Sequence, residues 1–459
     1  MSEKMKKSIK WLLPLIAIVS LAAGSLVGML VFGGTADTGL TAVTIEAKPA
    51  KEADYDFSYT PDILTSNYYG DNRKVMTELT KLQSLVKEGK AAKDDTVSAL
   101  TSAFSELGAF SLYYTYDGDI TREIDGVRYG AYVNEGEDPI GGGVGYSEIF
   151  TTGDYVVDTV DELLDALGKA KSGEVIFIEG HALIDVSGIT PLTLGEGVTL
   201  ASDRGRALED GSYSTGAKIF GASLEISSMI FASDNSRLSG LVIDGRNPYT
   251  HAAHHSRSFG GDWSSFYGTS YYSLRSVNFE GIKAGSNVRV DNCEISGFGH
   301  AAIHIAPNSK DVTVDHCYIH HNQTNGLGYG ICHNDASTSV VEYCLFNYNR
   351  HSIAATGSPT TGYIARYNIE MGESLSHCFD IHGGNDRGDG TDIAGTYCEM
   401  YNNTFLSKKY PYWLRGVPED YQIFYNNICV EPLESYSREL LVNERATLYD
   451  NIFGGELEK

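Results

Sequence analysis

Histidine, arginine and aspartate residues recur among short apolar runs in the C-terminal half of the chain. In Ala302-Ile-His-Ile305 and in Phe379-Asp-Ile-His382, the apolar residues alternate with His304, Asp380 and His382. Successive side chains of a β-strand point to opposite faces, so we expect the apolar residues to face a core and the polar ones to face outward. The runs are therefore predicted to be strands that present ionisable groups on one surface.

We expect these strands to occupy one sheet in successive turns of the chain, which would align their outward residues in a column. The predicted column comprises His304, the Cys332/His333 region, Ala354, Asp380, His382 and Arg415. The turns before the strands add His320, His321, Arg350 and His351. Each histidine alone is equally well explained as a turn residue bonded to its neighbours. The density of ionisable groups on one edge, however, exceeds what solubility needs and favours a functional site.

The residue types in this column suit β-elimination from a uronate polysaccharide. In that reaction a base removes the proton α to the carboxylate while a cation neutralises the carboxylate. A histidine that titrates near neutral pH suits the first task, and an arginine fork suits the second. We therefore expect His351 or His382 as the base and Arg350 as the carboxylate clamp, with Asp380 orienting a histidine. Further candidates are His321 for catalysis and His304, His320 and Arg415 for substrate binding.

Other functions match the residues less well. Glycoside hydrolysis needs two carboxyl groups about 5–9.5 Å apart, and Asp380 has no evident carboxyl partner in the column. A non-catalytic protein that binds glycan or builds the cell envelope is the main alternative. A role in copper-enzyme maturation is weaker, because the seven Cys and 13 His residues form no Met/Cys/His copper motif. The net charge of −25 opposes a polyuronate ligand, so a local Arg/His patch, Ca²⁺ or a neutral glycan would be needed.

Two insertions interrupt the regular pattern. The first, 246–275, is rich in aromatic residues, and its Trp263 and Tyr267 are candidates for stacking on sugar rings, with a covering flap as the alternative. The second contains Asn385-Asp-Arg-Gly-Asp-Gly-Thr-Asp392. Its carboxylates could hold Ca²⁺, which takes oxygen ligands in flexible geometry, although the spacing matches no EF-hand loop.

The strands that carry these residues belong to a repeat. The pattern apolar-x-x-(Cys/Asn/Tyr)-x-(Ile/Phe) ends at Ile295, Ile319, Phe346, Ile369, Phe405, Cys429 and Phe453, at intervals of 24, 27, 23, 36, 24 and 24 residues. Helical repeats need about 33 residues or more, and leucine-rich repeats need a leucine ladder. A coil of three short strands and three turns fits the interval, and coils stacked about 4.8 Å apart would pair every strand with its equivalents.

Equivalent side chains of such a stack should lie directly above one another. Cys293, Cys317 and Cys344 are predicted to stack inside the core, and Asn403, Asn427 and Asn451 to continue that column as a hydrogen-bonded ladder. The fold class predicted for 151–459 is therefore all-β, a right-handed parallel β-helix of about ten coils. Its open first coil needs a cap, and the amphipathic helix at 160–170, with Asp158 or Thr159 as its N-cap, lies where a cap is required.

The chain before the repeat has a different character. Lysines precede an uncharged run over 11–32, which is longer than the apolar core of a cleaved signal peptide and long enough to cross a bilayer. We predict a transmembrane anchor over 1–33, with a cleaved signal peptide as the alternative, and an extracellular or cell-surface location for the rest. Residues 34–60 are predicted to be a linker, and 61–150 a helical hairpin followed by small β-hairpins. The 60 acidic against 35 basic residues exclude nucleic acid as a partner.

Several motifs resemble those of a known superfamily. Glu174-Val-Ile-Phe-Ile178, Ile184-Asp-Val-Ser-Gly188 and Gly197-Val-Thr-Leu-Ala-Ser-Asp-Arg-Gly205 resemble the opening coils of pectate-lyase-like β-helix proteins. Tyr348-Asn-Arg-His-Ser-Ile353 and His377-Cys-Phe-Asp-Ile-His-Gly383 are similar to exported archaeal and bacterial β-helix repeat proteins. The resemblance covers about 155–455 and implies the fold, whereas activity varies among polysaccharide lyases, glycoside hydrolases and tail-spike binders. The paired aspartates of polygalacturonase-like hydrolases and the calcium cluster of pectate lyases are not evident.

Overall fold

The computed structural model describes residues 120–186, 189, 191–221, 228–245, 280–322, 327–371, 374 and 376–459. All of them lie in one compact unit, Ala50–Lys459. No helix among these residues is long and apolar enough to cross a membrane. The predicted anchor at 1–33, the linker at 34–60, the helical hairpin, Trp263 and Tyr267 lie outside the described residues and stay predictions.

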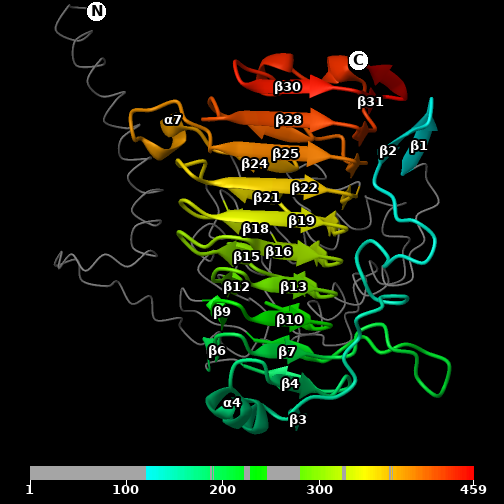
Figure 1. The fold of residues 1–459 in the computed structure, drawn as a ribbon, viewed down its shortest axis with the longest axis vertical. Coiled ribbons are helices and arrows are strands. Elements are labelled where there is room, and N and C mark those ends of the chain that lie inside the picture. The colour runs from blue at the N-terminus through cyan, green and yellow to red at the C-terminus, as the bar shows by residue number, and fades with distance from the viewer. Residues whose placement is uncertain are drawn as a thin grey trace, which may run out of the picture. The chain divides into compact units, whose positions relative to one another are not determined.

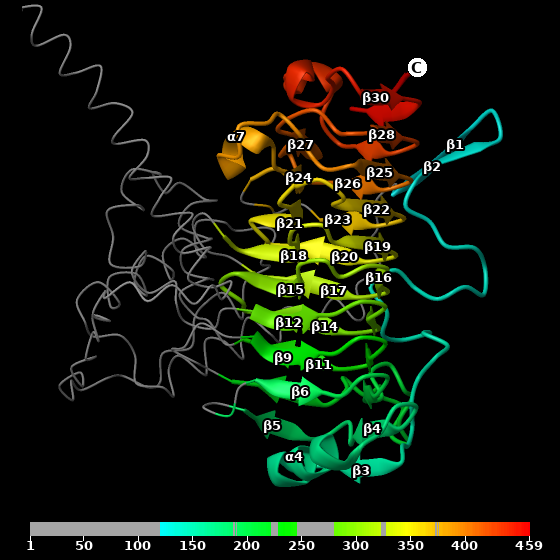
Figure 2. The ribbon, with the colours of Figure 1, turned by 60° about the vertical axis from the view of Figure 1, so that its left-hand side comes forward.

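Three sheets of stacked strands make up the described part of the chain (Figures 1 and 2). The first sheet consists of β3 (Tyr155–Val157), β4 (Val175–Ile178), β7 (Thr199–Ala201), β10 (Arg237–Ser239), β13 (Arg289–Asp291), β16 (Val312–Asp315), β19 (Thr338–Glu342), β22 (Gly362–Arg366), β25 (Tyr397–Tyr401), β28 (Tyr421–Tyr425) and β30 (Ala446–Tyr449). The second consists of β5 (Leu183–Asp185), β8 (Lys218–Phe220), β11 (Val242–Asp244), β14 (Glu294–Ser296), β17 (Tyr318–His320), β20 (Leu345–Asn347), β23 (Ile369–Glu370), β26 (Thr404–Phe405), β29 (Ile428–Cys429), β31 (Asn451–Phe453) and β32 (Glu456–Glu458). The third consists of β6 (Leu192–Leu194), β9 (Ser228–Ala232), β12 (Glu280–Ala284), β15 (Ala301–Ile305), β18 (Tyr329–His333), β21 (His351–Ala355), β24 (Phe379–Ile381) and β27 (Tyr412–Leu414).

The chain visits the three sheets in a fixed order, as in β13, β14 and β15 and then β16, β17 and β18. Each of these strands pairs in parallel with its equivalent one coil later. Among the described strands of the three sheets, β32 alone pairs antiparallel with its neighbour, which is β31. This winding is that of the predicted parallel β-helix.

The register of the second sheet produces a row of inward side chains. Its members are Ile219, Ile243, Ile295, Ile319, Phe346, Glu370, Phe405, Cys429 and Phe453. The predicted alignment was therefore wrong by one residue in one coil, because Phe346 pairs with Glu370 rather than Ile369. The sequence pattern favoured the apolar neighbour, whereas the fold buries a carboxyl at this position.

The predicted ladder of small buried side chains is present. Cys293, Cys317 and Cys344 are fully buried thiols. The backbone N–H of Cys344 donates to Asn368 Oδ1 at 2.9 Å, so Asn368 joins the column above the cysteines. Asn368 Nδ2 then donates to Asn403 Oδ1 at 3.0 Å, and the same contact links Asn403 to Asn427 and Asn427 to Asn451. These amides satisfy one another in the interior, where an unpaired polar group would be costly.

Helix α4 (Val160–Lys169) lies between β3 and β4 at the N-terminal end of the stack (Figure 1). Thr159 is its N-cap, and Glu162 completes a capping box. Leu163 and Ala166 are buried and join the main apolar core. The first sheet begins before this helix, at β3, and not after it as the sequence pattern suggested. Short 3₁₀ helices η4 (Leu433–Ser435) and η5 (Arg438–Leu440) precede β30 near the other end.

Residues 120–150, here called the strap, pack along the outside of the coils (cyan in Figure 1). The strap begins with the antiparallel hairpin of β1 (Thr121–Ile124) and β2 (Val127–Gly130). The N–H of Gly130 donates to Asn426 O at 2.8 Å, in a late coil. Further along, the N–H of Gly143 donates to Asn292 Oδ1 at 2.7 Å, in an early coil. The strap thus runs against the direction in which the coils are added.

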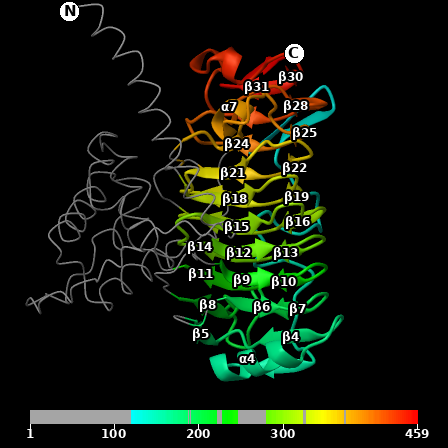
Figure 3. The same cartoon turned by 90° about the vertical axis from the view of Figure 1, so that its left-hand side faces the viewer.

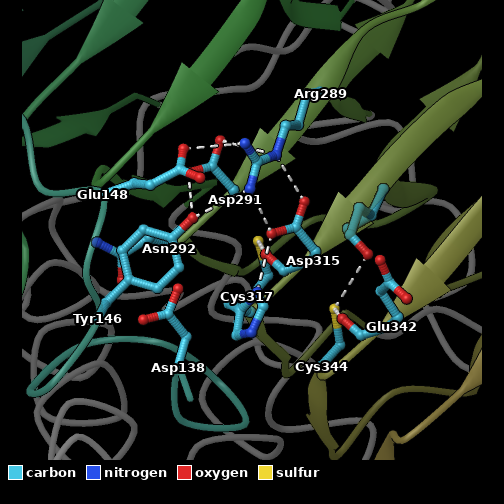
Figure 4. Close-up of polar contacts among 12 residues, drawn as sticks. Asp138, Tyr146, Glu148, Arg289, Asp291, Asn292, Asp315, Cys317, Glu342 and Cys344 are labelled. Atoms are coloured by element: carbon cyan, nitrogen blue, oxygen red, sulfur yellow. Dashed lines mark hydrogen bonds and ion pairs between the residues drawn. The ribbon is translucent and has the colours of Figure 1, made fainter. Parts of the chain in front are cut away.

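Polar side chains fix the far end of the strap to the first sheet (Figure 4). The hydroxyl of Tyr146 donates to Asp291 Oδ2 at 2.8 Å. Glu148 binds Arg289 Nη1 at 3.0 Å, and Arg289 Nε binds Asp315 at 2.9 Å. Because Asp291 and Asp315 are buried and their partners partly so, this network holds the strap more firmly than exposed ion pairs would.

Candidate functional site

Strands β12, β15, β18, β21, β24 and β27 of the third sheet lie one above another (Figure 3). Their registers align two rows of side chains. One row consists of the register partners His304, Cys332, Ala354, Asp380 and Trp413. The second row consists of Glu280, Ala301, Tyr329 and His351. The predicted alignment of His304, Cys332, Ala354 and Asp380 is therefore confirmed. His382 and Arg415 follow the ends of β24 and β27 and contact Asp380.

Asp380 is the centre of the larger cluster. Its Oδ1 lies 3.0 Å from Arg415 Nε and 3.2 Å from His377 Nε2. Its Oδ2 lies 3.0 Å from His382 Nε2 and 3.8 Å from His351 Nε2. One buried carboxylate therefore faces three imidazoles and a guanidinium.

The hydrogen bonding of His351 defines which of its nitrogens is basic. Its Nδ1 lies 2.6 Å from the carbonyl oxygen of His377, so Nδ1 carries the ring proton. The Nε2 of His351 has no hydrogen-bond partner among the described residues, and Asp380 Oδ2 lies 3.8 Å from it. His351 therefore directs an unoccupied lone pair toward the carboxylate of Asp380.

Burial and neighbouring charge determine the protonation of the cluster. Burial raises the pKa of Asp380, but the facing His377 and His382 outweigh it and hold the pKa well below its ordinary range. Burial, and then the Arg350 guanidinium, lower the pKa of His351 well below its ordinary value. Burial also lowers the pKa of His377. An ionised Asp380 beside neutral His351 and His377 is the state expected near neutral pH.

The two arginines of the site differ in their partners. Arg415 is neutralised, because it contacts Asp380 and lies 3.6 Å from Asp386. Arg350 pairs with no carboxylate of the described residues. Its guanidinium lies 5.7 Å from the ring centre of Tyr329, and its buried Nε has no described hydrogen-bond partner. Arg350 is thus the cation of this cluster that remains available to an acidic ligand.

The side chains of the cluster differ in their exposure to solvent. The side chains of His382 and Arg415 are 28% and 24% exposed, whereas those of Asp380 and His351 are fully buried. Trp413 is partly exposed, and its ring lies 5.1 Å from that of His377. A ligand that approaches from solvent would therefore meet His382 and Arg415 first.

A second cluster lies on β12 and β15 of the same sheet. Glu280 Oε1 lies 3.0 Å from His300 Nδ1 and 2.6 Å from His304 Nδ1. All three side chains are buried. Tyr329 lies between the clusters, because its ring is 5.8 Å from those of both His300 and His351.

His300, His377 and Glu280 were missed by the sequence reasoning. His300 precedes its strand in the turn, where strand alternation predicts no direction for a side chain. Two features of the sequence could have identified these histidines as candidates. His300 lies four residues before His304, and His377 lies directly before the predicted strand.

Three histidines predicted in or beside the column lie elsewhere. His333 faces the interior, where its Nε2 contacts Ser339 Oγ at 2.6 Å, because strand alternation turns it opposite to Cys332. His320 belongs to β17 of the second sheet and contacts Glu294 at 3.3 Å. His321 Nδ1 lies 2.8 Å from His320 Nδ1, in the turn between the second and third sheets. The predicted single edge is therefore divided between two sheets.

The acidic loop proposed to hold Ca²⁺ contains the short helix α7 (Gly384–Arg387). Asp389 accepts hydrogen bonds from Arg387 and Thr391, and Asp386 faces Arg415. These two carboxylates are thus directed at arginines.

Residues 215–371 match the family described as "Right handed beta helix region". Among solved structures, an alginate lyase from Paenibacillus sp. str. FPU-7 is 14% identical with a TM-score of 0.38, covering 66% of this chain and 96% of its own. A family 28 exopolygalacturonase from Yersinia enterocolitica is 14% identical with a TM-score of 0.34, covering 65% of this chain and 64% of its own. A GH87 α-1,3-glucanase from Streptomyces thermodiastaticus strain HF3-3 is 12% identical with a TM-score of 0.32, covering 69% of this chain and 54% of its own. No curated protein matches the chain.

Proposed function

We propose that this right-handed parallel β-helix protein is carbohydrate-active and cleaves a uronate-containing polysaccharide by β-elimination. The observation that carries the proposal is the arrangement around Asp380. A buried carboxylate holds three histidines and Arg415 in place, next to a guanidinium at Arg350 that has no described carboxylate partner. Such a site contains a base, an orienting acid and a free cation, which are the groups that elimination from a uronate requires.

His382 is the first choice for the base. Its Nε2 faces Asp380 at 3.0 Å, no described residue bonds its Nδ1, and it is the most exposed imidazole of the cluster. His351 is the second choice, since its free Nε2 has the right tautomer but lies in the buried interior. Either imidazole would take the proton α to the carboxylate, as a base positioned by a buried acid does in other enzymes.

Arg350 is proposed to bind the uronate carboxylate as charge builds up on it. A guanidinium binds a carboxylate through two parallel hydrogen bonds, and stabilising the developing charge lowers the barrier. As the proton leaves, the bond between the β carbon and the glycosidic oxygen breaks and an unsaturated uronate forms. Tyr329 is the proposed donor of a proton to the leaving oxygen. Burial raises its pKa, so the hydroxyl keeps its proton, and it lies 3.5 Å from Arg350 Nη1.

The chain carries a net charge of −25, which repels a polyanion at long range. The guanidinium of Arg350, which pairs with no carboxylate of the described residues, would offset this locally. Lower salt screens this long-range repulsion less, so the polymer should approach the chain less readily, while the short-range contacts in the site stay intact. The ionic strength of the assay therefore matters.

The test is incubation of the full chain with polygalacturonate, alginate and glucuronan, with a neutral glucan as a control polymer. Ultraviolet absorbance of an unsaturated uronate should rise with at least one acidic polymer and not with the glucan. Arg350→Ala and Asp380→Asn should each slow the rise strongly. His181→Ala and Arg438→Ala, which change exposed side chains, should leave it unchanged.

Two results would contradict the lyase proposal. Binding of polymer without cleavage would favour the non-catalytic glycan-binding alternative. New reducing ends without unsaturated product would indicate hydrolysis.

A further inference from the structure

We propose that Glu280, His300 and His304 form a binding site for a divalent transition-metal ion of the zinc type. The site would be separate from the Asp380 cluster and would link β12 to β15. Two imidazole nitrogens and one carboxylate oxygen are a ligand set that zinc uses when a fourth position is left for water or another group. The sequence did not predict a zinc-type site, because Glu280 and His300 were not identified as candidate site residues from it.

The three ligand atoms already converge. His300 Nδ1 and His304 Nδ1 lie 3.0 and 2.6 Å from the same oxygen, Glu280 Oε1, and all three atoms lie within 4.8 Å of one another. Zinc ligands at about 2.1 Å in tetrahedral geometry are roughly 3.4 Å apart. The contacts to Oε1 would therefore have to lengthen by less than about 1 Å to admit an ion, which side-chain rotation can supply.

Hydrogen bonds from neighbouring residues orient Glu280 and His304. The hydroxyl of Ser228 donates to the other oxygen of Glu280 at 2.5 Å, which leaves Oε1 directed at the histidines. Asn334 Nδ2 lies 3.3 Å from His304 Nε2 and fixes the plane of that ring. Metal-binding histidines and carboxylates are usually oriented in this way by groups that do not touch the ion.

Binding would change one of these contacts. A metal on Nδ1 moves the ring proton of His304 to Nε2, where it needs an acceptor. The amide of Asn334 would turn over and present its oxygen, at the cost of the hydrogen bond that Oδ1 now receives from Asp335.

Glu280 supplies the negative charge of the site, and Lys283 is a nearby cation. No arginine or lysine of the described residues forms an ion pair with Glu280, whereas Asp380 is bound by Arg415. Lys283 is the register partner of His304, but its ammonium lies 5.7 Å from the ring centre of Phe231. The Asp380 cluster is the weaker metal site because a guanidinium occupies it.

The consequence of an ion here would be mechanical. Glu280 is the first residue of β12, and His304 lies in β15, the next strand of the sheet. An ion that binds the folded chain and not the unfolded one raises the free energy of unfolding in proportion to the logarithm of its concentration. A metal at Glu280 would therefore tie two adjacent coils together.

The test uses the full chain, stripped with a chelator and then dialysed against Zn²⁺ or Co²⁺. We expect one tightly bound ion per chain, an absorption spectrum of four- or five-coordinate Co²⁺, and a higher melting temperature with metal. Glu280→Gln and His304→Ala should each weaken binding at least tenfold. Asp380→Asn and His181→Ala should bind as the unmodified chain does.

The controls separate this proposal from the proposed function. His300→Asn is a milder variant that keeps a polar side chain, for use if His304→Ala does not fold. No bound ion, or an ion lost in Asp380→Asn and kept in Glu280→Gln, would overturn the metal site. Loss of polymer cleavage with normal metal binding would instead count against the lyase alone.

Discussion

Arg415 Nε lies 3.0 Å from Oδ1 of Asp380 in a partly buried ion pair. The side chain of Asp380 is fully buried, and that of Arg415 is 24% exposed. Removing the guanidinium leaves a buried carboxylate with less compensation. Breaking a fully buried pair costs about 3–5 kcal/mol, and the partial exposure of Arg415 reduces this. We expect Arg415→Ala to lower the free energy of unfolding by roughly 2 kcal/mol in urea denaturation. An unchanged urea midpoint would mean that the histidines alone compensate Asp380.

Arg350 and Asp380 should affect activity differently. Arg350→Lys keeps the charge but loses the two-pronged geometry, so we expect a loss of roughly tenfold in kcat/KM, against about 100-fold or more for Arg350→Ala. Asp380→Asn should lower kcat without a comparable rise in KM, because it disturbs the base and not the carboxylate clamp. Steady-state kinetics on the cleaved polymer measure both. Equal effects of the lysine and alanine variants would remove Arg350 from the role of clamp.

The pH dependence of cleavage distinguishes the two candidate bases. Burial and Arg350 lower the pKa of His351, so this imidazole stays unprotonated below the usual histidine pKa of about 6.5. If His351 is the base, the acid limb of kcat/KM lies below the usual histidine pKa, and His351→Ala abolishes activity over the whole range. If His382 is the base, His382→Ala abolishes activity and His351→Ala retains part of it. A rate that does not respond to either substitution would exclude both.

Glu370 should make the fold more stable in mild acid than in mild base. Burial raises its pKa to about 8, above the value of 4.5 for an unperturbed glutamate, and neither oxygen has a described hydrogen-bond partner. The native chain therefore holds a proton that the unfolded chain has lost between these two pH values, so stability falls as pH rises through this window. The slope is up to about 1.4 kcal/mol per pH unit.

Glu370→Gln removes this titration. We expect the variant to melt at a higher temperature than the unmodified chain at pH 8 and to show little change between pH 5 and 8. Thermal unfolding followed by circular dichroism measures both. Glu434→Gln, an exposed glutamate, is the matched control and should behave as the unmodified chain. A pH profile shared by all three proteins would show that Glu370 is not the group that titrates.

The asparagine ladder should be sensitive to deletion of one member. Asn403 donates to Ala365 O and Asn427 Oδ1 and accepts from Asn368, so Asn403→Ala would leave several buried groups unpaired. Each unpaired group costs about 1–3 kcal/mol, which predicts a loss of roughly 3–5 kcal/mol. Urea denaturation measures the loss, and Asn385→Ala, at an exposed position, should change stability by less than about 0.5 kcal/mol. A small effect at Asn403 would indicate that water replaces the amide.

The repeat made much of this architecture predictable from sequence. Stacked coils place equivalent residues above one another, so the Cys344 position indicated where Asn403 would lie, and His304 and Asp380 were placed in one row. Prediction failed where this periodicity gives no information. His300 and His377 lie in turns before their strands, and Glu370 occupies a position where the pattern favoured the adjacent isoleucine. The packing of the strap was also inaccessible, because it joins residues such as Gly143 and Asn292 that are 149 apart in sequence.

Proteins made of like units that touch only their neighbours can fray from an end, one unit at a time. The strap opposes this, because its hairpin is hydrogen-bonded to the late coil of Asn426 while its other end is held by Asn292 and Asp291 in early coils. Fraying from the C-terminal end that reaches the coil of Asn426 would release the hairpin, and fraying from the N-terminal end that reaches the coil of Asp291 would release Tyr146. A tether of this kind couples the opening of coils near the two ends of the stack and holds the two histidine clusters at a fixed separation.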